Sequence, residues 1–132
     1  MRDFHKLSIW QRSLLLTLEV YKATKLFPSE ELFGLTSQIR RAVTSIPTNI
    51  AEGCGRASNK DLAHFLQIAI GSASEVEYEL LLANSLNYID DNNYRLLSDE
   101  TVSVRKMIIN YRNELIAHHS KLTTHRSPLK TQ

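Results

Sequence analysis

The sequence predicts an all-α protein, built as an antiparallel up-down-up-down four-helix bundle. The 132 residues include 4 glycines and 3 prolines, fewer turn residues than an all-β chain of this length needs. Apolar residues recur at steps of three and four in four long segments, which is the spacing of one helix face. The breaks between the segments are short, and helices joined by short connections bury their apolar stripes against one another.

The first predicted helix runs from about residue 7 to residue 26. Pro28 follows it and ends it, because the residue before a proline is pushed out of the helical conformation. We expect its buried stripe to consist of Leu7, Trp10, Leu14, Leu18 and Tyr21.

The second predicted helix begins at Ser29, a favourable N-cap residue. Pro47 lies inside it and is expected to kink or locally break it, because proline has no backbone N–H. The hydroxyls of Ser45 and Thr48 are available to the backbone groups that Pro47 leaves free. Gly53 and Gly55 are expected to end the helix. The predicted stripe comprises Leu32, Leu35, Ile39, Ala42, Ile46 and Ile50.

The third and fourth predicted helices carry the most regular patterns. Residues 58–61 match a capping box at the start of the third helix, and Asp90 or Asp91 is expected to cap the fourth. The third stripe comprises Leu62, Leu66, Ala69, Ala73, Val76, Leu80, Ala83 and Asn87. The fourth comprises Tyr94, Leu97, Thr101, Val104, Ile108, Tyr111, Leu115 and His118. The domain prediction is therefore an N-terminal arm (1–6), the bundle (7–120) and a disordered basic tail (121–132).

The composition argues against several classes of protein. A single cysteine, Cys54, excludes an internal disulfide framework. The apolar runs are far shorter than the roughly 18 residues of a membrane span, and the first residues lack the apolar core of a signal peptide. We therefore expect a cytoplasmic protein without a membrane partner.

The charge is unevenly distributed along the chain, although the net charge is only +2. Residues 1–60 hold 9 Lys/Arg against 5 Asp/Glu, whereas residues 61–104 hold Arg95 alone against 8 acids. Residues 105–132 hold 6 Lys/Arg against Glu114. Such asymmetry can serve nucleic-acid binding, self-association of opposite faces, or solubility alone.

Catalytic patterns are weak in this sequence. No glutamate is followed by histidine three residues later, as a di-metal bundle site requires, and Glu114 with His118 gives a single pair at four residues. Cys54 lies between two glycines and is expected to be accessible, but His64 is ten residues away and nothing fixes a base beside the thiol. The prediction is a protein that is not an enzyme and has no cofactor or metal.

The most unusual stretch is residues 38–56. One interpretation is a proline kink with polar residues that repair it, in which Asn49 and Glu52 make structural hydrogen bonds. Replacing either by alanine is then expected to lower stability. The other interpretation is a polar and basic functional surface.

Residues 45–53 (SIPTNIAEG), with Gly55 and Arg56, resemble the signature of four-helix bundle proteins encoded within 23S ribosomal RNA intervening sequences. Residues 4–11, 27–42 and 69–77 are similar to the opening, second helix and third helix of that family. The resemblance covers about residues 4–117, and it implies an antiparallel four-helix bundle that assembles into a homopentamer in the bacterial cytoplasm. It does not imply an enzyme. The family is also similar to accessory proteins of diversity-generating retroelements, which are basic pentameric bundles that bind nucleic acid and a reverse transcriptase.

Two functions stay open at this point. The first is a homo-oligomer that binds RNA or DNA through the phosphate backbone, and the second is a structural or protein-interaction scaffold that does not bind nucleic acid. The oligomer is expected because the third helix has a second apolar face, formed by Phe65, Ile68, Leu82 and Leu86. The residues predicted to contact nucleic acid are Arg40, Arg41, Arg56, Lys60, Arg105, Lys106 and Arg112. The residues assigned to the structural motif are Ser45, Pro47, Asn49, Glu52, Gly53 and Gly55.

Overall fold

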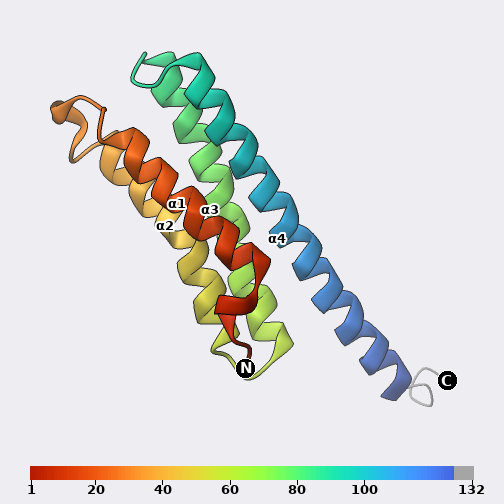
Figure 1. Ribbon diagram of the computed structural model, residues 1–132. Helices are drawn as coiled ribbons and strands as arrows, with labels where there is room; N and C mark the ends of the chain where they lie inside the picture. Colours follow the sequence, from red (N-terminus) through yellow and green to blue (C-terminus); the bar gives the residue numbers. More distant parts are fainter. Residues whose placement is uncertain (127–132) are drawn as a thin grey trace.

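The structure, a computed structural model, describes the backbone of residues 1–126 and the side chains of residues 1–118. It contains α1 (Ser8–Thr24), α2 (Leu35–Cys54), α3 (Asn59–Ser85) and α4 (Asp91–Arg126), with short 3-10 helices η1 (Phe4–Lys6) and η2 (Ser29–Glu31). Each α-helix packs against the next one along the chain, and α1 also packs against α4 (Figure 1). This closed order of neighbours confirms the predicted four-helix bundle.

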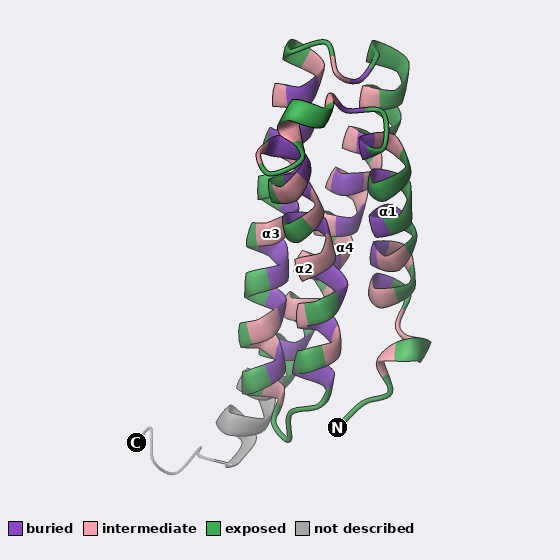
Figure 2. Cartoon of the chain, turned by 90° about the vertical axis from the view of Figure 1, so that its left-hand side faces the viewer, coloured by how far each residue is buried: buried purple, intermediate pink, exposed green. Residues whose placement is uncertain are grey.

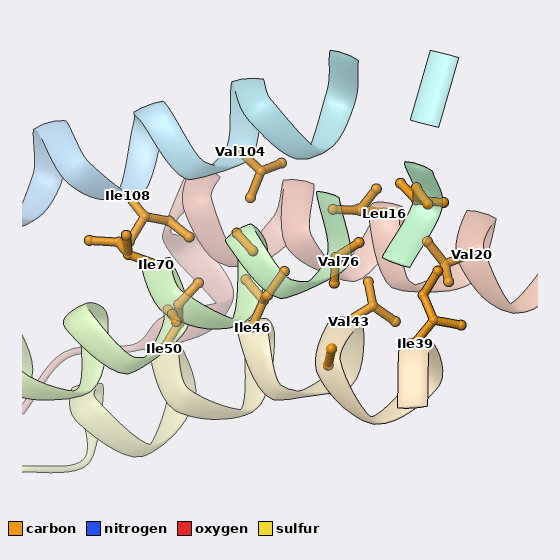
Figure 3. Close-up of a cluster of buried hydrophobic side chains, with 14 of the residues drawn as sticks. Leu16, Val20, Ile39, Val43, Ile46, Ile50, Ile70, Val76, Val104 and Ile108 are labelled. Carbon is orange, nitrogen blue, oxygen red and sulfur yellow. The ribbon is translucent and has the colours of Figure 1, made fainter. Parts of the chain in front are cut away.

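The core forms where the sequence pattern is most regular. Every α3 residue from Leu62 to Ala83 in the predicted stripe is buried. Leu97, Val104 and Ile108 of α4 are buried as well. Figure 3 shows Val104 and Ile108 in one cluster with Leu16 of α1 and Ile46 of α2. The predicted stripes are thus confirmed from Leu62 to Ala83 on α3 and from Leu97 to Leu115 on α4, whereas Asn87 and His118, the last residues of the two predicted stripes, are exposed.

The buried face of α1 differs from the prediction. Leu18 is 56% exposed and Tyr21 is 40% exposed, whereas Leu16 and Val20 are buried. Ser13, Thr17 and Thr24 are buried as well, and each donates its hydroxyl hydrogen to a carbonyl of its own helix. Burying a hydroxyl costs little free energy when the hydroxyl is hydrogen-bonded in this way. The core face of α1 is therefore partly polar, and the predicted stripe residues Leu18 and Tyr21 lie at the surface.

The second helix begins later than predicted. Pro28 and Ser29 open the single turn η2, and α2 starts at Leu35. A Cβ at Gly34 would lie 2.6 Å from Oε1 of Glu31, which accepts a hydrogen bond from the Leu35 N–H at 3.1 Å. Because the Glu31 carboxylate lies this close to Gly34 and bonds to the Leu35 N–H, it sets the start of α2. Leu32 therefore lies outside the helix and is exposed.

Pro47 does not break α2, which is continuous from Leu35 to Cys54 (Figure 1). The missing proline N–H leaves the carbonyl of Val43 without its helical partner. Thr17 of α1 replaces that partner in part, because its single hydroxyl hydrogen is shared between the Ser13 carbonyl at 2.8 Å and the Val43 oxygen at 3.2 Å. The hydroxyl of Thr48 bonds instead to the carbonyl of Thr44. The repair therefore comes from a neighbouring helix and not from Ser45 or Thr48.

The remaining helix ends follow their capping residues. The Ser58 side chain accepts from the Asp61 N–H, and Asp90 accepts from the Asn93 N–H, as predicted. The last helix continues to Arg126, beyond the predicted bundle end at residue 120, while residues 127–132 of the predicted tail lie outside the described residues. Among the described helices, none is both long and apolar enough to cross a bilayer.

Candidate nucleic-acid interface

Two polar residues of the 45–56 stretch, Ser45 and Asn49, form a hydrogen-bonded chain that reaches α3. The side-chain amide of Asn49 donates to the carbonyl and to the hydroxyl of Ser45, at 2.8 and 2.9 Å. The Ser45 hydroxyl lies 2.8 Å from that of Ser72 on α3. This chain of contacts confirms the structural hydrogen bonds predicted for Asn49. Glu52 is exposed and pairs with Arg56 at 2.8 Å, so its contact lies at the surface.

Gly53 does not end α2, contrary to the prediction. It is buried within the helix, and a Cβ there would meet Cδ1 of Leu62 at 2.8 Å and Cβ of Phe65 at 3.0 Å. Its missing side chain therefore lets α3 approach closely. Gly55 occupies the C-cap with φ −78°, a right-handed conformation that any residue can adopt.

Two of the predicted nucleic-acid ligands lie in the first half of α2. Arg40 donates to the Thr24 hydroxyl at 2.8 Å, and its guanidinium lies 4.7 Å from the centre of the Tyr21 ring. These contacts hold Arg40 against the end of α1. Arg41 is exposed and bonds to the Ser37 hydroxyl one turn earlier. Arg40 therefore contributes to packing, whereas Arg41 faces solvent.

Two other predicted ligands already have acidic partners. Arg56 pairs with Glu52 and lies 4.9 Å from the centre of the Phe65 ring. Arg105 forms an ion pair with Glu77 across the α3–α4 contact. A phosphate would have to displace these carboxylates, which weakens both arginines as ligands.

The structure brings Lys60 and Arg112 together. They line a groove of about 500 Å³ between the first turns of α3 and the second half of α4. The full lining, here named the basic groove, is Asn59, Lys60, Ala63, His64, Gln67, Arg112, Leu115 and Ile116. Lys106 is exposed on α4 and does not line the groove. The seven predicted cations thus do not form one surface, because about 24 Å of helix separates Arg40 from Arg56.

The local electrostatics of the basic groove favour an anion. The N-terminus of α3 carries the positive end of the helix dipole, and the first backbone N–H groups of a helix have no intrahelical partner. Beside it lies a second hollow of about 230 Å³, whose lining includes Arg2, His118 and Glu114. Arg2 donates to the Asn59 side chain at 2.8 Å, which holds the N-terminal arm at this end of the bundle.

Sequence reasoning missed His64 as a groove residue. It was considered only as a partner for Cys54, although it lies four residues after Lys60 and therefore on the same helix face. The four-residue spacing between Lys60 and His64 was the signal that places His64 in the groove. His64 is exposed.

Cys54 is buried and not accessible, contrary to the prediction. The backbone N–H of Arg2 bonds to its carbonyl, so the N-terminal arm covers the end of α2. Burial raises the pKa of the thiol, which lowers its reactivity. Within the described residues, no three His, Cys, Asp or Glu side chains cluster closely enough to bind a metal ion.

Fold and groove together define a helical-bundle protein with a groove lined by Lys60 and Arg112 beside the start of α3. The chain belongs to the family of 23S rRNA-intervening sequence proteins, whose family model matches residues 5–110. This confirms the resemblance carried by residues 45–56.

The chain is also similar to a solved structure from Bacteroides thetaiotaomicron, described as a protein of unknown function from the S23 ribosomal protein family. The two sequences are 28% identical, and the match covers 79% of this chain and 97% of that chain with a TM-score of 0.71. No curated protein matches this chain.

Proposed function

We propose that this protein is a non-enzymatic homo-oligomer, most simply a pentameric ring, that binds RNA through the phosphate backbone. The number five comes from the family resemblance. A location in the bacterial cytoplasm is part of the proposal. The observation that supports RNA binding is the basic groove, in which Lys60, His64 and Arg112 converge on the N-terminus of α3.

The groove favours phosphate over base recognition. Besides the imidazole of His64, its lining contains cations, amides and aliphatic groups, and it has no Phe, Tyr or Trp on which a base stacks. Contacts to phosphate give affinity with little sequence information. A closed ring repeats the groove in every subunit, so a subunit of net charge +2 presents a strongly basic surface.

A salt titration with a fluorescently labelled RNA hairpin tests this proposal. The affinity of the parent should fall with rising salt, with a log–log slope of roughly 0.7–0.9 per phosphate contacted. Lys60→Glu and Arg112→Gln should each weaken binding and make this slope shallower. Lys22→Glu is the matched control, because Lys22 is exposed near the opposite end of the bundle.

Light scattering on the same samples separates the two parts of the proposal. The parent should have the mass of five chains, and the groove variants should keep that mass. A protein that does not bind the hairpin at low salt, or groove variants that bind as tightly as Lys22→Glu, would refute the nucleic-acid part.

The second candidate is a scaffold that binds protein and not nucleic acid. The observation that favours it is the exposed apolar surface of α1 and of the connection after it, including Leu18, Leu26 and Phe33. An oligomer without salt-dependent RNA binding would support this alternative. A stoichiometric metal ion in the purified protein would contradict both candidates as stated.

A further inference from the structure

The second hollow, beside the basic groove, contains the aromatic side chain that the groove lacks. Its lining is Arg2, Asn59, Tyr111, Glu114, Leu115 and His118. Asn59 and Leu115 line the basic groove as well, so the two depressions are contiguous. An RNA strand that lies in the groove can therefore reach the second hollow with an adjacent base.

The N-terminal arm places Arg2 in this hollow. The backbone N–H of Arg2 bonds to the carbonyl of Cys54 at 3.0 Å, and its guanidinium donates to Oδ1 of Asn59 at 2.8 Å. Figure 2 shows the N-terminus and the exposed connection between α2 and α3 at the same end of the bundle. One backbone and one side-chain hydrogen bond thus hold the guanidinium beside the start of α3.

Arg2 and Tyr111 give the second hollow two planar groups. Tyr111 is partly buried and packs against the hydrophobic core, which fixes its position on α4. An aromatic ring and a guanidinium plane are the two kinds of side-chain group on which an unpaired base stacks. A base in a duplex is already stacked and paired, so a single strand supplies a base to such a hollow at a lower cost.

Glu114 determines which base fits. It is the only carboxylate among the described residues that line the groove and the second hollow. It is exposed, and the glutamates in ion pairs among the described residues are Glu52, Glu77 and Glu100. A carboxylate only accepts hydrogen bonds, through two oxygens. Guanine is the base whose Watson–Crick edge presents two adjacent donors, N1–H and N2–H, and this edge is free only when the base is unpaired.

The place of Glu114 also argues for a direct contact. A carboxylate at the rim of a groove that binds phosphate repels the RNA backbone. It therefore weakens binding unless it contacts a donor group of the nucleic acid itself.

We propose that the second hollow binds one unpaired guanine of single-stranded RNA, with the neighbouring phosphate in the basic groove. The base stacks on Tyr111 and Arg2, and Glu114 accepts hydrogen bonds from N1–H and N2–H. The inference rests on the RNA binding proposed above. It adds a base preference, which contacts to phosphate alone do not give.

Fluorescence anisotropy with three labelled RNAs tests the guanine site. The first is a single-stranded oligouridine with one central guanosine, the second has adenosine at that position, and the third is the first strand annealed to its complement. The parent should bind the guanosine strand about fivefold or more tightly than the adenosine strand, the lower end of what a bidentate contact to a base edge gives.

Two substitutions separate the base contact from the charge. Glu114→Gln keeps the size of the side chain but replaces one acceptor with a donor, so it should bind the guanosine and adenosine strands equally. Arg2→Lys keeps the charge but removes the stacking plane, so it should weaken both single strands and leave the duplex unchanged. Glu19→Gln is the matched control, because it removes the same charge from an exposed site on α1 and should keep the guanosine preference.

The possible failures are distinguishable. Equal affinity of the parent for the guanosine and adenosine strands would overturn the guanine site. So would a Glu114→Gln variant that binds all three RNAs more tightly by the same factor, since the carboxylate would then act only through its charge. Both results leave the proposed backbone binding in place if Lys60→Glu weakens every RNA. A parent that binds none of the three RNAs at low salt would overturn the proposed function and this inference together.

Discussion

Glu79 offers the sharpest test of the packing between α2 and α3. It is 3% exposed, and its Oε1 atom is buried without a hydrogen-bond partner among the described residues. Burial raises the pKa of this carboxyl from its ordinary 4.5 to about 7, and the negative charge of Glu75 adds to the rise, while Arg41 opposes it. The folded protein therefore holds a proton on Glu79 that the unfolded chain releases.

The sign and size of the effect follow from this difference. Between the two pKa values the folded state binds more protons, so the contribution of Glu79 to stability is greatest below pH 4.5 and falls as pH rises to about 7. At about 1.4 kcal/mol for each pKa unit, the loss reaches about 3 kcal/mol above that pH. This is a large fraction of the roughly 5–15 kcal/mol that stabilises a domain.

Glu79→Gln removes the titration while keeping the shape of the side chain. We expect its free energy of unfolding relative to the parent to rise by about 2–3 kcal/mol between about pH 5 and about pH 8.5. Urea unfolding at both pH values measures this difference, and constant effects of the amide cancel in it. Glu19→Gln is the control, because Glu19 is exposed on α1 and should track the parent. Parallel pH curves for Glu79→Gln and the parent would refute the argument.

Four further substitutions test individual contacts by urea unfolding at one pH. Asn49→Ala should lower the free energy of unfolding by about 1–3 kcal/mol, whereas Glu52→Ala should change it by less than about 0.5 kcal/mol, because its ion pair is exposed. Thr17→Val should cost about 1–2 kcal/mol, since the carbonyl of Val43 then loses its donor, and a cost near zero would contradict the repair of Pro47. Gly53→Ala should cost about 1–3 kcal/mol through overpacking, and a variant as stable as the parent would show that α3 yields easily.

The sequence predicted the elements that its periodicity describes uniquely. On α3 and α4 the apolar residues alternate at steps of four and three, and only one face of each helix fits them. The residues from Leu62 to Ala83 and from Leu97 to Leu115 were therefore assigned to the core with few errors. The break expected at Pro47 is absent, because a hydroxyl on another helix partly replaces the missing N–H, and contacts between helices are not encoded in local spacing.

The candidate site was predicted only in part. Lys60 and Arg112 were both named, but their convergence depends on the register between α3 and α4, which a single sequence does not reveal. The Arg56–Glu52 pair follows the four-residue spacing and was readable from the sequence. The Arg105–Glu77 pair joins α4 to α3, so it depends on the same register and was not readable from the sequence.

The burial pattern of α1 bears on the proposed homo-oligomer. This helix buries Ser13 and Thr17 while leaving Leu15 and Leu18 more than half exposed. Fully burying one leucine is worth about 1.5–3 kcal/mol, so a chain selected for monomer stability alone would place these leucines inside. Sequences break such local rules mainly where function requires it. The exposed leucines of α1 therefore support the proposed homo-oligomer, and light scattering on the parent protein measures whether a second copy is present to cover them.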